Sequence, residues 1–168
     1  MPTGLKQTSS LIQISTSVTE SGANTFTTNQ VDLQLNPLDN EVFVVQAVDL
    51  DLFPPNLLVA TKTVSALSLS STRRTTVAGI DQPNVIAAKR ITIQEAGGAA
   101  VSDEYMASDS PASNLEYIAI IATNDFFLNI EGQANTTTMA ANARVYGYRA
   151  RADSSVYAAL VQSEALSA

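Results

Sequence analysis

Three aspartates are the residues whose type and spacing come nearest to a chemical site in this chain. Asp49 and Asp51 lie two positions apart in one alternating run, and Asp32 lies in the run before it. Carboxylate oxygens that converge from neighbouring strands are ligands that Ca²⁺ takes in proteins. Carboxylates at positions i and i+2 are equally typical of the solvent face of a strand, and no EF-hand spacing is present. We therefore expect no metal and no cofactor, with Asp32, Asp49 and Asp51 as the candidate ligands if a metal were bound.

The sequence contains few residue types that commonly carry out catalysis. The chain contains no Cys and no His, which removes thiolate nucleophiles, the usual zinc sites and the side chain that titrates near neutral pH. No Ser or Thr lies in a nucleophile elbow, and the segment "AGGAA" lacks the lysine of a phosphate-binding loop. We expect no catalytic residues and no enzymatic activity.

The charge balance limits the classes of partner. Charged residues make up 15% of the 168 residues and the formal net charge is −7, whereas ordinary soluble domains are about 25% charged. Contact with phosphates needs clustered Lys and Arg, and the nine basic residues are scattered, so we expect no direct binding of nucleic acid. Neutral polar surface loses little when a neighbour covers it, which favours assembly.

One segment near the carboxyl end combines aromatic and basic residues. The run "VYGYRARAD" begins at Val145, and Tyr and Arg are enriched at protein interfaces. We predict that this strand and the start of the segment after it form subunit contacts. The alternative is a sheet surface with ordinary solvated arginines. The predicted interface residues are Tyr146, Tyr148, Arg149, Arg151 and Tyr157.

The elements that must position these residues are strands, because alternation with a period of two dominates the first 150 residues. We expect an all-β fold, a two-sheet antiparallel sandwich of about eight strands. Residues 95–114 are small and acidic and are expected to form a surface loop with a short helix. The eight expected strands are 10–19, 25–35, 41–52, 64–70, 85–94, 115–123, 126–132 and 143–150.

The whole chain, residues 1–168, is expected to form a single sandwich domain with residues 1–9 as an amino-terminal arm. Residues 153–168 are predicted as a carboxyl-terminal helix or tail, since Asp153 or Ser154 can cap a helix there. A ninth strand over "SSVYAALV" is the alternative, because short apolar runs are ambiguous by periodicity. The chain shows no signal peptide and no apolar stretch long enough for a membrane span, so we expect a soluble protein.

The run at residues 41–52 makes a specific demand on the fold. Residues 42–45 are all apolar, so both faces of the strand must be covered there. Further along, Val48, Leu50 and Leu52 alternate with the two aspartates, which predicts one buried face and one exposed face. The residues predicted to be largely buried in the sandwich are Phe43, Val45, Ile91, Ile93, Ile118, Ile120 and Phe127.

Eight β segments, low charge and a length near 170 residues together make the chain resemble a small single jelly-roll capsid protein of a virus or phage. The segments "VDLQLNPLDNEVFVVQAVDLDLFPP" and "RVYGYRARADSSVYAALVQSEALS" carry this resemblance. It implies two four-stranded sheets packed face to face and subunits that associate side by side. It further implies a self-assembling shell subunit located in the virion, assembled in the host cytoplasm, with copies of itself and other virion proteins as partners.

The amino terminus departs from this pattern. Many jelly-roll coat proteins carry a basic arm for the genome, whereas "MPTGLKQTSSLIQIST" is nearly neutral. Its inner surface is then expected to meet proteins or an internal membrane instead of nucleic acid. Two alternatives to the shell subunit remain open: another virion component, such as a tail tube, decoration or spike protein, and a lectin-like sandwich that acts as a binding module.

Overall fold

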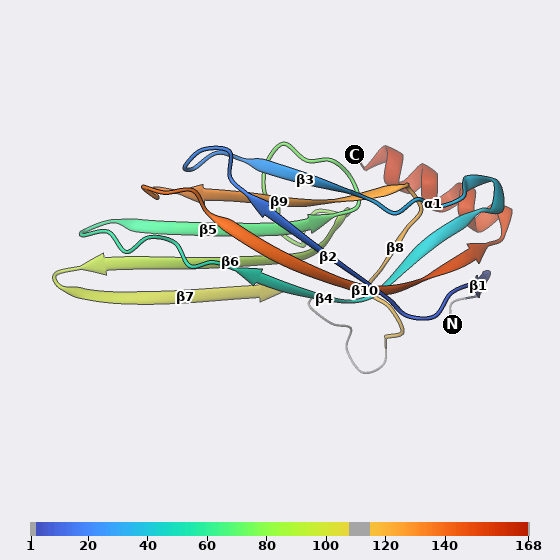
Figure 1. Cartoon of the computed structure of the whole chain (residues 1–168), viewed down its shortest axis with the longest axis horizontal. Coiled ribbons are helices and arrows are strands. Elements are labelled where there is room, and N and C mark those ends of the chain that lie inside the picture. The colour runs from blue at the N-terminus through green and yellow to red at the C-terminus, as the bar shows by residue number, and fades with distance from the viewer. Residues whose placement is uncertain (1–2, 108–114, 168) are drawn as a thin grey trace.

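The computed structural model describes residues 3–107 and 115–167 (Figure 1). Within these residues the chain forms ten strands, a short 3-10 helix at Pro37–Asp39 and one α-helix. The strands are β1 (Leu5–Gln7), β2 (Ile12–Thr19), β3 (Thr27–Asp32), β4 (Glu41–Leu52), β5 (Lys62–Ser70), β6 (Val85–Ala96), β7 (Ala99–Ala107), β8 (Ala119–Ile121), β9 (Asp125–Gln133) and β10 (Ala140–Ala152), and the helix is α1 (Ser154–Leu166).

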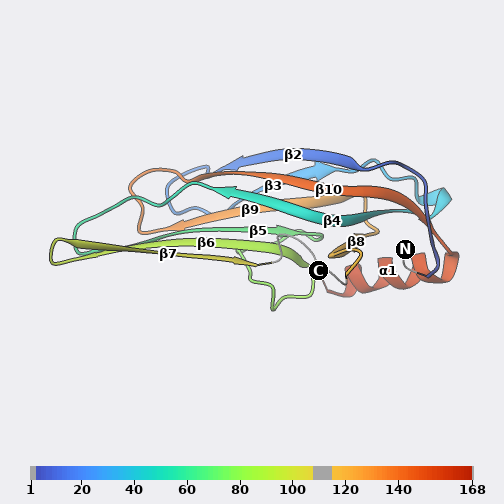
Figure 2. The same cartoon turned by 90° about the horizontal axis from the view of Figure 1, so that it is seen from below.

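The strands form two antiparallel sheets that pack face to face (Figures 1 and 2). Sheet A has the order β2-β10-β4-β8, with β1 beside the far end of β10, and sheet B has the order β3-β9-β5-β6-β7. Six of the nine steps between successive described strands thus cross from one sheet to the other. This is the arrangement of the jelly roll, which occurs in viral capsid and lectin domains. The expected all-β, two-sheet sandwich with a carboxyl-terminal helix is confirmed, and the ninth-strand alternative for that segment is wrong.

Two segments differ from the expectation. The stretch expected as a surface loop with a short helix instead contains β7, which forms a hairpin with β6 around Gly97 and Gly98. Both glycines have positive φ, at 63° and 85°, which a tight turn requires. Residues 108–114, where the rest of that prediction falls, lie outside the described residues. Part of the expected amino-terminal arm pairs with β10 as β1.

A β-bulge in β4 explains how one strand serves two packing partners. Tyr146 on β10 pairs with Ala47, and the next residue, Gly147, pairs with Val45, which leaves Gln46 without a partner. The extra residue shifts the alternation by one. As a result, apolar residues on both sides of the bulge face the same core between the sheets, namely Phe43, Val45, Val48, Leu50 and Leu52.

The opposite face of this part of β4 is covered by the carboxyl-terminal helix. Val42 and Val44 belong to a second apolar cluster with Tyr148, and α1 packs against this cluster. The helix supplies Val156, Tyr157, Leu160 and Val161. Figure 2 shows α1 at the end of the molecule where β4 begins and β10 ends. The prediction that both faces of residues 42–45 are covered is therefore confirmed.

The predicted core is correct in part. Phe43, Val45 and Phe127 are buried. Ile91 and Ile93 lie in the half of β6 that leads to the hairpin with β7 and are only partly buried, although Ile91 still packs against the main core. Ile118 and Ile120 are also partly buried, since they precede or belong to β8, the short edge strand of sheet A.

Among the described residues, no helix has both the length and the apolar character that a membrane crossing needs.

Candidate functional site

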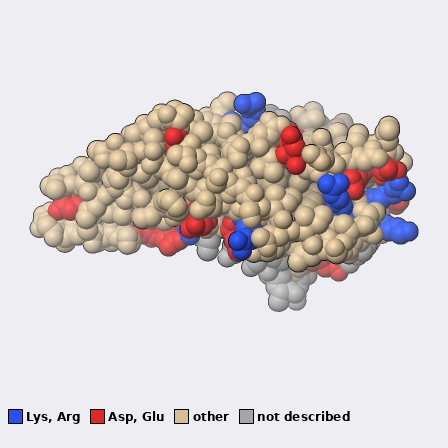
Figure 3. Space-filling view, in the orientation of Figure 1, with Lys and Arg blue, Asp and Glu red and all other residues tan. Residues whose placement is uncertain are grey.

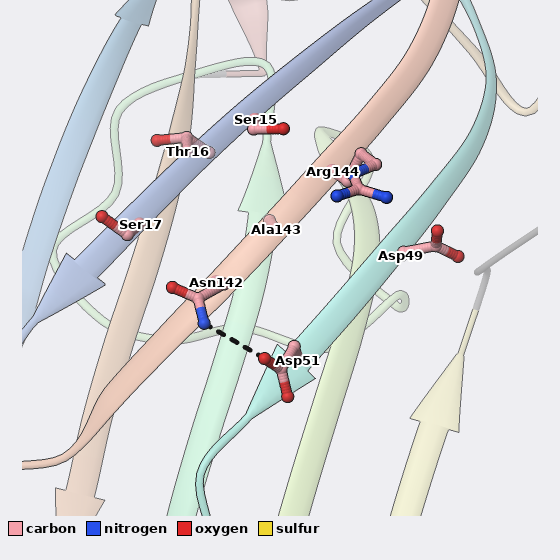
Figure 4. A pocket seen from close by; sticks show the side chains of 8 residues that line it. All are labelled: Ser15, Thr16, Ser17, Asp49, Asp51, Asn142, Ala143 and Arg144. Carbon is pink, nitrogen blue, oxygen red and sulfur yellow. Dashed lines mark hydrogen bonds between the residues drawn. The ribbon is translucent and has the colours of Figure 1, made fainter.

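The outer face of sheet A carries a polar depression of about 590 Å³ that contains two of the three candidate aspartates (Figure 4). Its side chains come from three adjacent strands, and the strand register sets them in two rows. Arg144 on β10 pairs with Ser15 on β2 and Asp49 on β4, and Asn142 pairs with Ser17 and Asp51 in the next row. They alternate with core residues of the same strands, so the sandwich fixes their direction.

The polar groups in this depression are engaged with one another. Asn142 Nδ2 donates a hydrogen bond to Asp51 Oδ2 at 3.1 Å, and Tyr146 Oη donates to Asp49 Oδ2 at 3.1 Å. Hydrogen bonding and electrostatic interaction with Tyr146, and then the charge of Asp49, raise the pKa of Arg144. Each aspartate thus has a partner of its own in the sheet.

The third candidate aspartate lies elsewhere. Asp32 is on β3 of sheet B, where it pairs with Asp125. Gln30 Nε2 donates to Asp125 Oδ2 at 2.7 Å. Burial and then the charge of Asp32 raise the pKa of Asp125. The structure therefore separates Asp32 from Asp49 and Asp51, and the described residues contain no group of three or more Asp, Glu, His or Cys side chains placed to hold a metal.

The five predicted interface residues are divided between different environments. Tyr146 lies on the open face of sheet A, whereas Tyr148, two residues later, is buried under α1. Burial, and then electrostatic interaction with Glu116 and Tyr117, raise the pKa of Tyr148. Tyr157 packs against the same cluster from the helix and borders a shallow groove beside Leu35.

The two arginines tie the end of β10 to the segment before β4. Arg149 donates to the carbonyl oxygens of Leu33 (2.7 Å) and Gln34 (3.2 Å), and forms an ion pair with Glu41 at 3.2 Å. Arg151 forms an ion pair with Asp39. These contacts lie within one subunit and do not test the predicted subunit contact, which stays a prediction.

Sequence analysis did not identify two carboxylates that are buried in the structure. Glu20, at the end of β2, accepts hydrogen bonds from the backbone N–H groups of Gly132 (2.6 Å) and Met139 (2.7 Å). Glu164 on α1 accepts from Ala122 and Thr123, just after β8. Each joins segments more than 40 residues apart. An isolated Glu in a polar context gives no sequence signal for such a role, because the donors become close only in the fold.

Sequence analysis also did not identify a cluster of asparagine side chains in the loops at the end of the sandwich away from α1. Asn56, in the β4–β5 loop, donates its N–H to Asn135 Oδ1 at 3.0 Å, and its own Oδ1 accepts the N–H groups of Thr136 and Thr137. Asn24 and Asn135 exchange two further bonds between side chain and backbone. Three loops of the sandwich are therefore held together.

Proteins similar to this chain are found among solved structures and not among the sequences compared. No family model matches the sequence, and no curated protein sequence matches it. Among solved structures, the chain is similar to "Desmodium yellow mottle tymovirus", with 9% identity and a TM-score of 0.34 over 92% of this chain and 96% of that chain.

A second similar structure is a tailspike protein, gp49 from Acinetobacter baumannii bacteriophage Fri1, a capsular polysaccharide depolymerase. It has 9% identity and a TM-score of 0.17, over 72% of this chain and 20% of that chain. At such values the fold assignment is carried by the strand order of the chain itself. At the level of architecture, the predicted resemblance to a single jelly-roll capsid protein is confirmed.

Proposed function

We propose that this chain is a structural, non-enzymatic subunit that associates with copies of itself into the shell of a virion. The jelly-roll sandwich resembles the fold of viral capsid proteins. A fold alone does not define a function, so the proposal depends on what the surface presents to a neighbouring subunit.

The observation that carries the proposal is an apolar loop that the fold holds rigid. The β4–β5 loop exposes Phe53, Leu57 and Val59, of which Val59 has 84% of its surface in solvent. Exposed apolar groups that lie close together are typical of interaction surfaces. Asn56 sits among them and is fixed by its bonds to the β9–β10 loop. A loop that is ordered before contact loses little entropy on binding, which favours association.

The charges on the surface are consistent with broad contact between subunits. Figure 3 shows a face that is largely free of Lys, Arg, Asp and Glu, with the charged groups mainly near one end and along one margin. Some of the basic residues are paired with acids within the chain, as in Lys89 with Glu104 at 2.7 Å. The surface therefore offers few basic side chains for a nucleic acid, and we propose copies of the chain and other virion proteins as the partners.

The experiment compares the full-length protein with a variant that carries Phe53→Ser, Leu57→Ser and Val59→Ser. Light scattering after size exclusion and negative-stain electron microscopy then measure particle size. We expect closed particles from the parent and unassembled protein from the triple variant, with little change in melting temperature because the replaced side chains are exposed.

Val101→Ser is the matched control, since Val101 is an exposed apolar residue on β7, outside the loop. This control should assemble like the parent. Particles of parent size from the triple variant would remove the loop from the interface. A parent protein that stays monomeric at high concentration would contradict the structural role, while stacked rings would indicate a tail tube in place of a shell.

A further inference from the structure

A second depression, which we call the sheet B cleft, lies on the face of sheet B turned away from sheet A. Its volume is about 660 Å³, within the range of about 300–1,000 Å³ that small-molecule sites occupy. Ala66 and Glu131 contribute to it, and both alternate with core residues, Leu67 and Ile130. The loop 77–79 borders the cleft on one side. No sequence motif marks this surface.

The strand register builds the cleft from two rows of side chains. In the first row, Ala66 on β5 pairs with Glu131 on β9 and Arg90 on β6, and Arg90 pairs with Tyr105 on β7. In the second row, Val64 takes the place of Ala66, between Gln133 and Thr92, and Thr92 pairs with Asp103. The small side chains on β5 form a floor, and the longer ones on either side form walls. The strands that carry Glu131 and Arg90 are two strand spacings apart, about 10 Å.

The polar groups of this cleft differ from those on sheet A in being uncommitted. In the described part of the chain, the side chains of Arg90, Asp103, Glu131 and Lys62 make no hydrogen bond or ion pair with one another or with any other residue. On sheet A, by contrast, Asp51 already accepts a bond from the neighbouring asparagine. Hydrogen-bonding capacity that the protein leaves free in a concave site is available to a ligand.

The charges and the aromatic ring indicate the kind of ligand. Two cations, Lys62 and Arg90, oppose two anions, Asp103 and Glu131. Lys89 also borders the cleft but is paired with Glu104, so no net charge remains with which to select a phosphate or a metal ion. Arg and Lys donate and carboxylates accept, and a hydroxyl group satisfies both. Tyr105 has 50% of its surface exposed and offers a flat apolar ring beside them.

From this arrangement we propose that the sheet B cleft binds a neutral oligosaccharide. Its hydroxyl groups would bond the charged side chains on both walls, and one sugar ring would lie against Tyr105. The cleft is complete within one subunit, so binding does not require self-association.

The test uses the full-length protein on a printed array of neutral, sialylated and sulfated oligosaccharides. The strongest neutral oligosaccharide is then titrated by saturation-transfer NMR, which reports binding to a monomer and to a large particle alike. Tyr105→Ala and Arg90→Ala should each weaken the apparent affinity at least about tenfold. Both side chains lie on the surface, and circular dichroism would verify that each variant keeps the β spectrum of the parent.

Asn142→Ala is the control, since it alters the polar depression on the opposite sheet and should leave binding unchanged. Three results would overturn the proposal: no neutral oligosaccharide on the array binds, only sialylated or sulfated ones bind, or the two cleft variants bind as tightly as the parent. None of these results depends on whether the protein forms shells, so the two proposals fail separately.

Discussion

Substitutions of Glu164 separate two opposing effects that this side chain has on the docking of α1. Glu164 is 7% exposed. One of its carboxylate oxygens accepts the backbone N–H of Ala122 at 3.2 Å and that of Thr123 at 2.8 Å. Burial raises the pKa of Glu164, and this effect outweighs the hydrogen bonds, which lower it. The bonds hold the helix to the end of sheet A, while the buried charge opposes that contact.

The structure gives the size of each effect. Glu164→Ala removes the acceptor for two N–H groups, and a buried donor without a partner costs about 1–3 kcal/mol. Since water can reach part of the enlarged site, we expect a loss of about 2–4 kcal/mol in the free energy of unfolding. Glu164→Gln keeps a carbonyl oxygen for both donors and removes the charge, so its unfolding free energy should stay within about 1 kcal/mol of the parent at neutral pH.

Removing the carboxyl group also changes how stability depends on pH, relative to the parent. A folded-state pKa above the ordinary value of 4.5 means that the folded protein binds this proton more tightly than the unfolded chain. The stabilising contribution of Glu164 is therefore complete below pH 4.5 and is lost as the pH rises through the folded-state pKa. Glutamine has no such proton, so the difference in stability between Glu164→Gln and the parent should move in favour of the variant with rising pH.

Urea unfolding followed by circular dichroism, repeated between about pH 4 and 8, measures both effects. The useful quantity is the difference in the free energy of unfolding between Glu164→Gln and the parent, because the other carboxylates contribute equally to both proteins. A cost below about 0.5 kcal/mol for Glu164→Ala would show that the two hydrogen bonds do not support the docking of α1. A difference between Glu164→Gln and the parent that is constant with pH would refute the argument from the buried charge.

Two further changes test the packing on the two faces of β4. Gly147→Ala should lower the free energy of unfolding by about 1–3 kcal/mol or more, because a Cβ atom there would lie 2.3 Å from the Val44 carbonyl oxygen and 2.7 Å from the Phe43 ring; a change below about 0.5 kcal/mol in urea unfolding would contradict this. Truncation after Ala152 should lower the melting temperature and abolish particle formation, since it uncovers Val44 and Tyr148; particles of parent size by electron microscopy would show that α1 takes no part in assembly.

The pattern along β4 shows how far sequence alone defines this fold. The four apolar residues 42–45 indicate that both faces of the strand are covered there, without showing what covers them. The alternation after them indicates which face of the later half of the strand is exposed. The same reasoning predicted the other strands except β1 and β7, because apolar positions in those segments recur with period two. Sequence analysis did not show that α1 covers the face of β4 that carries Val42 and Val44, since α1 lies more than 100 residues away in the chain.

The failures have a common physical origin in contacts that only the fold creates. In β7, Val101, Asp103 and Tyr105 are all exposed, as are the residues between them, so the strand carries no buried alternation for sequence analysis to detect. Tyr146 and Tyr148 have the same parity on β10, yet only Tyr148 is covered by the helix. The sheet B cleft depends on which residues pair across four strands, and strand register is not readable from one strand at a time.

The bulge at Gln46 allows β4 to pack against the sandwich core and against the helix α1 at the same time. Without the extra residue, Val48 and Leu50 would share a face with Val42 and Val44, and the strand could fill either the sandwich core or the helix contact, but not both. With the extra residue, residues 42–45 contact both the sandwich core and α1, and Asp49 and Asp51 face the solvent. The same shift aligns Gly147 with Val45, where the absence of a side chain leaves room for Phe43. The polar surface of sheet A and the docking of the carboxyl-terminal helix are therefore coupled through a single unpaired residue.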